Sequence, residues 1–495
     1  MNDPLDDLYA RLNLSAKATP EEIRHAYRQL ARQHHPDTQA APAGTTLLFR
    51  QIQEAYDLLS DPVRRAAYDQ QQIEAGRSPD ALFHWNMQLS RSILPLIEGE
   101  QVIYVLLEIA AGQPVKSIER LPLNLCLVLD RSTSMQGARL DQTKAAAQRM
   151  IESLTSEDSL GIVTFSDRAE VVWPNQTLTD PIRTKAKISA IQASGGTEIL
   201  QGLNAGLVEL DKHRRERSIN HLILLTDGQT YGDEEQCITA ALEAKKRRIG
   251  ISALGIGEDW NDTLLDAIAT RSGGVSQYIA STGEIQHFLR ERLQGLGSTY
   301  SENLRLTIKA TKGTLLQNAF TLLPYIRRIE SEKDTLLLGA LELNKPITAL
   351  LEFVIGPHAS GLQRVAQLEL SGDIPSQNRL GERLRRDVSF TFSPMAAANL
   401  AVPPNILSAL AKITIFRMQE GAWQALDKGD IVGATNRLET MATRLLDLGE
   451  HDLARAALLE AGRLARNGNT SAAGRKAIKY GTRSLTKSLK KEQKS

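Results

Sequence analysis

The chain has few cysteines, no long apolar run and almost no net charge. Its 495 residues include two cysteines, Cys126 and Cys237, which lie far apart and form no metal-binding pattern. This excludes a disulfide scaffold and a four-cysteine zinc region, and it suits a reducing compartment. No run of about 18 apolar residues occurs, and the acidic start lacks the apolar segment of a signal peptide. We therefore expect a cytoplasmic protein without a membrane span, and the net charge of +1 implies no general attraction to polyanions.

Signatures of common enzyme classes are also missing. The chain has no Gly-x-Ser-x-Gly nucleophile elbow, no Walker phosphate loop and no dinucleotide-binding fingerprint. The nearest glycine-rich segment, residues 253–257, lacks a third glycine, and an ordinary strand end explains it. His221 and His287 belong to no supporting motif, so surface or packing roles suit them better than catalysis. We therefore expect that this protein is not an enzyme.

The tripeptide His35-Pro36-Asp37 lies between two amphipathic helical patterns near the N-terminus. In the first pattern, Thr19 is suited to cap the helix, and Glu22 occupies the reciprocal capping-box position before an apolar stripe. The ring of Pro36 ends this helix. A separate basic stripe with i, i+4, i+8 spacing comprises Arg24, Arg28 and Arg32.

Downstream, residues 48–59 carry a second apolar stripe, and Ser60-Asp61-Pro62 caps a short last helix over residues 64–69. With the tripeptide, these four ordered helical signals resemble a J-domain, the module that activates DnaK-type heat-shock chaperones. The resemblance implies a DnaK-type partner, contacted by the tripeptide and by the basic stripe. An ordinary helix-ending turn beside a solvated basic face is the alternative reading. Gln29, His34 and Thr38 differ from the residues that are usual at these positions of J-domains. We expect these differences to affect the strength of the chaperone contact and not the fold.

The middle of the chain alternates between strand and helix signals. Residues 121–129 are typical of a fully buried strand, and further signals alternate up to residue 293. Such alternation predicts a doubly wound parallel sheet, which binds ligands at the carboxyl ends of its strands. The loop after the first strand carries Asp130, Ser132 and Ser134, and two later loops carry Thr197 and Asp227.

These five positions resemble the metal-ion-dependent adhesion site of von Willebrand factor type A domains. The resemblance implies a divalent cation held by the carboxylates of Asp130 and Asp227 and by the hydroxyls of Ser132, Ser134 and Thr197. A carboxylate from a partner protein would then complete the shell. Oxygen ligands suit Mg²⁺, with Mn²⁺ or Ca²⁺ as alternatives. The other readings are a metal-free fold whose loops contain common turn residues, or a metal that only stabilises loops.

Segments rich in strand signals flank the α/β part on both sides. Residues 83–90 and 100–110 precede it, and five segments follow it over residues 303–310, 335–343, 347–355, 364–370 and 386–392. About seven strands predict a β-sandwich, with the α/β domain inserted between its second and third strands. Two separate sheets are the alternative.

The C-terminal part is helical and ends in a basic segment. Three helical patterns cover residues 405–426, 431–448 and 453–465. Their spacing of about 20 residues misses the roughly 34-residue tetratricopeptide repeat, so a three-helix hairpin is predicted, serving as a lid or as a groove for a partner. We expect residues 475–495 to form a solvated tail, with contact to anionic lipid as the alternative. No platform of interleaved aromatics supports a nucleic-acid partner.

The sequence therefore predicts a multidomain protein. An all-α J-domain covers residues 1–74, and a β-sandwich combines 82–115 with 298–395. The doubly wound α/β von Willebrand factor A domain covers 116–297, followed by a helical hairpin region (400–470) and a basic tail (471–495). We expect a cytoplasmic co-chaperone or adaptor that stimulates a DnaK-type ATPase and binds a client or partner protein through a metal-dependent A domain. A scaffold for an assembly-remodelling or membrane-associated complex, with the J-domain used only for recruitment, is the alternative.

Overall fold

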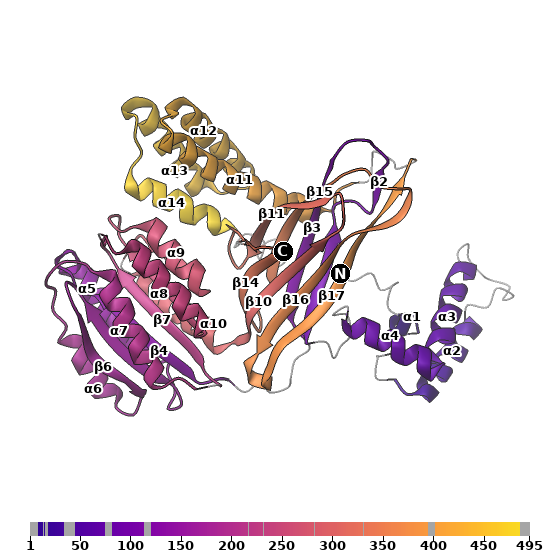
Figure 1. Ribbon diagram of the computed structural model, residues 1–495, viewed down its shortest axis with the longest axis horizontal. Coiled ribbons are helices and arrows are strands. Elements are labelled where there is room, and N and C mark those ends of the chain that lie inside the picture. The colour runs from indigo at the N-terminus through magenta and orange to yellow at the C-terminus, as the bar shows by residue number, and fades with distance from the viewer. Residues whose placement is uncertain are drawn as a thin grey trace.

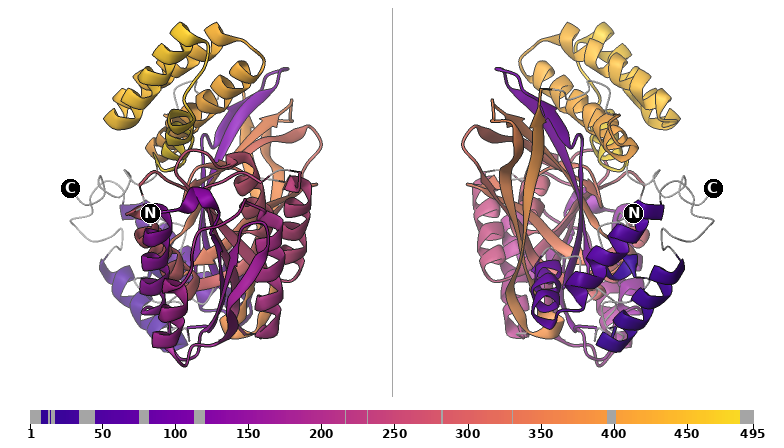
Figure 2. Two further views of the ribbon diagram at one scale, coloured as in Figure 1. Left: turned by 90° about the vertical axis from the view of Figure 1, so that its left-hand side faces the viewer. Right: turned by 90° about the vertical axis from the view of Figure 1, so that its right-hand side faces the viewer.

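The computed structural model describes residues 8–12, 14, 18–33, 45–74, 82–112, 120–215, 217–230, 232–281, 283–329, 331–394 and 401–485. The order of regions confirms the fold class predicted from the sequence: N-terminal helices, an α/β domain between two parts of a β-sandwich, and C-terminal helices. Figure 1 shows the N-terminal helices on the side of the sandwich away from the α/β domain. The C-terminal helices cover the top of the molecule in both views of Figure 2.

The N-terminal region consists of the helices α1 (Leu8–Arg11), α2 (Pro20–Gln33), α3 (Thr45–Leu59) and α4 (Pro62–Glu74). Buried apolar side chains from the first three helices form its small core, including Ile23, Ile52 and Leu59. Arg65 of α4 fastens the helices together, because its guanidinium donates to the Ala18 carbonyl at 2.7 Å and to the Tyr9 hydroxyl at 2.8 Å.

The β-sandwich consists of two sheets built from segments on both sides of the α/β domain. One sheet has the order β1-β3-β15-β11-β12 and the other β13-β14-β10-β16-β17-β2. The strands are β1 (Phe83–Leu89), β2 (Ile93–Pro95), β3 (Gln101–Ala111), β10 (Thr299–Ala310), β11 (Thr314–Leu323), β12 (Arg327–Arg328), β13 (Ser331–Glu332), β14 (Thr335–Glu342), β15 (Ile347–Ile355), β16 (Gly361–Ile374) and β17 (Arg379–Ser393). The single sandwich is therefore observed, and not two separate sheets.

Two details of the sandwich differ from the prediction. The short strand β2 pairs with β17, so the α/β domain follows the third strand of the sandwich and not the second. Strand β11 was also missed, although it occupies an interior position between β15 and β12. Its register shifts between Leu316 and Asn318 and again between Thr321 and Leu323, and such bulges interrupt the alternation by which strands are recognised in a sequence.

The α/β domain has a six-stranded sheet with the order β6-β5-β4-β7-β8-β9, in which only β6 is antiparallel to its neighbour. Helices α5, α6 and α10 pack on one face, and α7, α8 and α9 pack on the other. The elements are β4 (Leu123–Asp130), η1 (Thr133–Met135), α5 (Ala138–Ile151), β5 (Ser159–Phe165), β6 (Ala169–Thr177), α6 (Pro181–Ser189), α7 (Ile199–Lys212), β7 (Ile219–Thr226), α8 (Glu234–Lys246), β8 (Ile249–Ile256), α9 (Asp262–Ser272), β9 (Ser276–Ile279) and α10 (Glu284–Gly297). Edge strand β6 was not predicted, because it is half exposed and contains Pro174.

The C-terminal region has four helices and not the three that were predicted. They are α11 (Pro404–Asp427), α12 (Ile431–Asp447), α13 (His451–Asn467) and α14 (Ala472–Arg483). Ile413 and Phe416 of α11 pack against Phe320 and Leu350 of the sandwich, so these helices share a core with one of its sheets. No helix in the described part of the chain is both long and apolar enough to cross a membrane.

The prediction of a solvated basic tail is wrong for residues 472–485, because α14 docks on the α/β domain. The Tyr480 ring enters the core of that domain and packs beside Trp260 and Tyr278. The Lys476 ammonium donates to the Trp260 carbonyl at 2.7 Å and lies 4.5 Å from the centre of the indole ring. Residues 486–495 lie outside the described part of the chain. The basic residues of this segment had suggested a solvated tail, but Lys479 and Arg483 pair with carboxylates of α9.

Asp266 of α9 is the centre of this contact. It accepts two hydrogen bonds from Arg483, at 2.9 and 2.7 Å, and it lies 2.7 Å from the Lys479 ammonium. Burial alone would raise the pKa of Asp266, but the charges of Arg483 and Lys479 outweigh it and hold the pKa well below the usual range. A carboxyl with a depressed pKa stabilises the docked state above its unfolded value of about 4, and this contribution is lost as the pH falls below that value.

We predict that Asp266→Asn weakens the docking of α14 by about 3 kcal/mol, because it leaves Arg483 without its anion, whereas Lys479 keeps Asp262 as a partner. Faster amide hydrogen exchange over residues 472–485 would reveal this, and mild acidification below about pH 4 should have the same effect. Asp141→Asn is the control, since Asp141 is exposed on α5, which packs on the other face of the sheet from α9. Equal exchange in both variants would contradict a role of this ion pair.

Candidate functional site

The candidate metal site begins at the carboxyl end of β4, at the middle of the parallel sheet. All eight residues of β4 are buried, so Asp130 is held rigidly at its end. One carboxylate oxygen of Asp130 accepts the Ser132 backbone N–H at 2.8 Å, and the other accepts the Thr226 hydroxyl at 2.6 Å. These two bonds join the loop after β4 to the end of the neighbouring strand β7.

The next residues form a chain of polar contacts. The hydroxyl oxygens of Ser132 and Ser134 lie 3.0 Å apart, and the Ser134 hydroxyl donates to the Asp227 carboxylate at 2.7 Å. Asp130 and Asp227 are fully buried, Ser132 is almost so, and Ser134 is exposed. Hydrogen bonds thus connect four of the five predicted positions, Asp130, Ser132, Ser134 and Asp227. The group is exposed to solvent at Ser134.

Thr197 approaches the same place from a separate loop. A Cβ atom on Gly228 would lie 2.8 Å from the Thr197 hydroxyl oxygen, so Thr197 contacts the residue next to Asp227. The loop is fastened to the one after β4, because the Gly195 carbonyl accepts from the Thr133 backbone N–H and from its hydroxyl, both at 3.0 Å. Gly195 has a φ of +78°, which favours glycine at this turn.

This edge of the sheet carries two carboxylates, Asp130 and Asp227, and one paired guanidinium, Arg139. Burial raises the pKa of Asp130 to about 6, although hydrogen bonds from Ser132 and Thr226 oppose the shift, and the nearby charge of Asp227 adds to it. Arg139 of α5 supplies one counterion, since its guanidinium lies 2.5 Å from the second carboxylate oxygen of Asp227. Sequence reasoning missed Arg139, because nothing in its spacing from Asp227, 88 residues away, indicates that the two meet.

The arrangement is chemically suited to a hard divalent cation. Two carboxylates and three hydroxyls gather at one strand edge, and such neutral and anionic oxygens are the ligands that Mg²⁺ prefers. Among the described residues, no group of three or more His, Cys, Asp or Glu side chains could hold a metal. A cation at this edge would therefore depend on hydroxyl ligands as well as on the two carboxylates. Because so few of its ligands would be anionic, the cation could still bind a carboxylate from another molecule.

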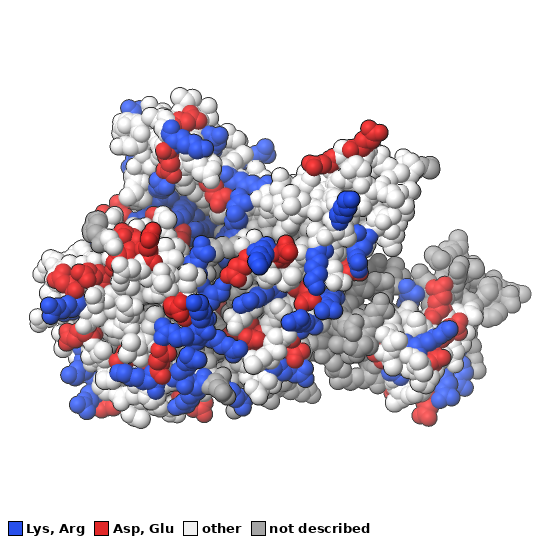
Figure 3. Space-filling view, in the orientation of Figure 1, with Lys and Arg blue, Asp and Glu red and all other residues white. Residues whose placement is uncertain are grey.

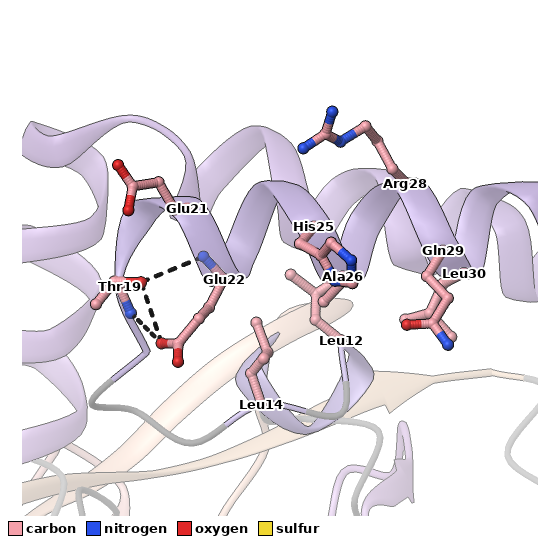
Figure 4. Close-up of a pocket in the computed structure, with 10 residues that line it drawn as sticks. All are labelled: Leu12, Leu14, Thr19, Glu21, Glu22, His25, Ala26, Arg28, Gln29 and Leu30. Carbon is pink, nitrogen blue, oxygen red and sulfur yellow. Dashed lines mark hydrogen bonds between the residues drawn. The ribbon is translucent and has the colours of Figure 1, made fainter.

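The second predicted site lies on the N-terminal helices and is described only in part. A hollow of about 930 Å³ lies beside α2. Among the residues that line it, Arg28 points away from Leu12 and Leu14 (Figure 4). The capping box is present as predicted: the Thr19 backbone N–H donates to the Glu22 carboxylate at 2.7 Å, and the Glu22 N–H donates to the Thr19 hydroxyl at 3.2 Å (Figure 4).

The basic stripe is exposed where it can be described. The side chains of Arg24 and Arg28 are exposed, and within the described part of the chain each bonds to the backbone of the preceding turn. Arg32 belongs to α2, but its side chain lies outside the described part, as does the whole of His35-Pro36-Asp37. The exposed guanidinium groups of Arg24 and Arg28 are suited to contact an acidic surface.

Three family models match this chain. Residues 7–69 match the DnaJ domain, residues 124–291 match the von Willebrand factor type A domain, and residues 404–488 match a "Sll0103-like, C-terminal alpha-helical domain". The third match includes α14, so the docked helix belongs to the same unit as α11–α13.

Two curated relatives illustrate how the parts combine. An uncharacterised protein of Synechocystis sp. is 29% identical over 65% of this chain and 78% of its own length. A chaperone protein DnaJ of Carboxydothermus hydrogenoformans is 50% identical over 64 residues, which are 13% of this chain and 17% of that protein. The likeness to DnaJ is therefore confined to the N-terminal helices.

Solved structures share the remaining architecture. A von Willebrand factor type A protein from Catenulispora acidiphila has a TM-score of 0.64 at 17% identity, covering 81% of this chain and 96% of that one. The ArnB paralogue VWA2 from Sulfolobus acidocaldarius has a TM-score of 0.50 at 13% identity, covering 82% and 99%. These likenesses concern the fold alone. Together with the family models, they show that this chain is a DnaJ domain fused to a von Willebrand factor type A domain.

Proposed function

We propose that this protein is a co-chaperone or adaptor that brings a DnaK-type chaperone to a partner held by its A domain. The J-domain would stimulate ATP hydrolysis by the chaperone, and the protein itself would catalyse no reaction. The A domain would bind a client or assembly partner through an acidic side chain that completes the shell of a divalent cation, most simply Mg²⁺. Both steps suit a cytoplasmic location.

The observation that carries this proposal is the convergence of Asp130, Ser132, Ser134 and Asp227 on a chain that also has a DnaJ domain. In Figure 1 the J-domain and the A domain lie on different sides of the sandwich, so one contact need not block the other. The chain has only two cysteines, which is too few for the four-cysteine zinc sites of some J-proteins. Client choice is therefore assigned to the A domain.

A second candidate is a scaffold of an assembly-remodelling or membrane-associated complex, in which the J-domain only recruits the chaperone. The extensive sandwich and helical regions, which make up much of the described chain, favour a role in holding partners. The two candidates differ in whether chaperone ATPase activity responds to this protein.

His35→Gln should abolish the stimulation of ATP hydrolysis by a cognate DnaK-type chaperone, because the resemblance places this imidazole at the chaperone contact. Single-turnover ATPase rates with increasing full-length protein test this. His287→Gln is the matched control, since the His287 side chain is 75% exposed on α10, far from the J-domain. Stimulation that survives His35→Gln would favour the scaffold instead.

Asp130→Ala should remove Mg²⁺ or Mn²⁺ binding, because it deletes one of only two carboxylates at the site. Isothermal titration with each ion measures this, and quantitative pull-downs with and without chelator measure the effect on partners. Asp141→Ala is the control, as this carboxylate is exposed on α5. Identical partners in wild type, variant and chelated samples would reduce the metal to a structural role.

Arg139→Gln should tighten Mg²⁺ binding about fivefold, or about 1 kcal/mol, because it removes a cation that competes for Asp227. The same titration measures the affinity. Arg149→Gln serves as the control, since Arg149 lies on the same helix and bonds instead to Gln286. An unchanged or weaker affinity in Arg139→Gln would show that this guanidinium does not compete with the ion.

A further inference from the structure

A cavity of about 550 Å³ lies where the A domain, the sandwich and α14 meet. Its walls come from the amino end of β7, from α10, from β10 and β14, and from the end of α14 at Tyr480 and Arg483. This is the edge of the A-domain sheet opposite to Asp130 and Asp227. Figure 3 shows Lys and Arg side chains gathered along the seam between the A domain and the sandwich. The volume lies within the range of sites for small organic ligands.

Arg292 of α10 is the unexplained residue in this cavity. Its Nε–H group is buried and donates to no acceptor, and its guanidinium makes no hydrogen bond or ion pair with any described residue. Burial lowers the pKa of Arg292, against the opposing charge of Glu342. Arg292 is half-buried and its guanidinium remains protonated, so the buried Nε–H without an acceptor costs free energy in the protein alone.

No carboxylate of the described residues forms an ion pair with Arg292, although the charges of Glu342 and Glu291 oppose the lowering of its pKa. Glu342 is paired with Lys345 at 2.8 Å. Burial raises the pKa of Glu302, another wall residue, to about 7, which lowers its negative charge near neutral pH. The buried imidazole of His221 lies close enough for the charge of Arg292 to lower its pKa further, so it is neutral.

Three other cations in the wall are already engaged. Arg483 binds Asp266, and Arg248 lies 3.4 Å from Asp373. Arg327 donates to the carbonyls of Leu337 and Leu338. Arg305 of β10 also lines the wall, but its side chain is exposed to solvent. Arg292 therefore differs from Arg305 in being half-buried, with a buried N–H group that has no acceptor among the described residues. Apolar side chains, among them Phe288 and Leu337, line the adjacent wall.

We propose that this cavity binds a small amphiphilic anion, with its carboxylate or phosphate head on Arg292 and its apolar body along Phe288. The planar guanidinium presents paired N–H donors that match such a head group. The apolar wall accounts for the rest of the volume. This site is separate from the metal edge and from the J-domain, and it holds whether or not the A domain binds a cation.

The rival explanation is that Arg292 only supports the fold. The two explanations make opposite predictions for Arg292→Met, which keeps the length of the side chain and removes its charge. If Arg292 is kept for a ligand, the variant loses a half-buried charge that has no ion-pair partner among the described residues, and its Tm rises in the absence of ligand. If Arg292 supports the fold, its Tm falls.

Isothermal titration of the full chain with dodecanoate, dodecyl phosphate, dodecanol and inorganic phosphate tests the proposal. We expect one molecule of dodecanoate or dodecyl phosphate per chain, with at least about tenfold weaker binding to Arg292→Met. Arg290→Met is the matched control, because Arg290 is exposed on the same helix and should bind as wild type does. Ala340→Trp, which adds bulk to the exposed wall on β14, should also weaken binding without touching the charge.

Several results would overturn the proposal. Equal binding of dodecanoate by wild type and Arg292→Met would remove Arg292 as the head-group contact, as would dodecanol binding as tightly as dodecanoate. Inorganic phosphate binding as tightly as dodecyl phosphate would remove the apolar part of the site. No saturable binding of either anion, together with a lower Tm in Arg292→Met, would establish the purely structural role.

Discussion

The pairing of β3 with β15 is the interaction on which the arrangement of this protein depends. It runs without a register shift from Gln101 opposite Ile355 to Ile109 opposite Ile347, joining segments that precede and follow the A domain. Ile103, Val105, Leu107 and Ile109 are buried along one side of β3, so a slip by one residue would expose them all. This pairing joins the strand before the A domain to the part of the sandwich that follows it, and the sandwich in turn provides the surface on which α11 packs.

The A domain places different chemistry at the two edges of its sheet. At the carboxyl edge, Asp130 and Asp227 are buried carboxylates, Arg139 pairs with Asp227, and the site opens to solvent at Ser134. At the amino edge, Arg292 is half-buried and its buried Nε–H has no acceptor among the described residues, and residues of the sandwich and α14 complete the wall of the cavity. Parallel strands produce this separation, because all their carboxyl ends lie together and leave the other edge for packing. α14 contributes to the second edge only because it docks through Asp266.

Local patterns predicted much of the fold. The capping box of Thr19 and Glu22 is local, and so is the run of buried residues in β4. The five metal-site positions were recognisable because each follows a strand or a glycine turn. Failures occurred where a segment depends on distant partners. Strand β11 is interrupted by bulges, β6 carries Pro174, and α14 appears as a basic tail until Asp262 and Asp266 are beside it.

The sequence by itself determined the order of regions, the helix and strand types of most segments, and which carboxylate and hydroxyl residues are candidates at the carboxyl edge of the A-domain sheet, since these follow from periodicity and residue chemistry within short windows. Only the tertiary structure decided that Arg139 meets Asp227, that α14 covers the A domain, and that Arg292 faces a cavity without an acceptor. Each of these depends on residues far apart in the chain. Whether a charge is paired or left alone in the interior is set by which surfaces the fold brings together, and no local pattern records it.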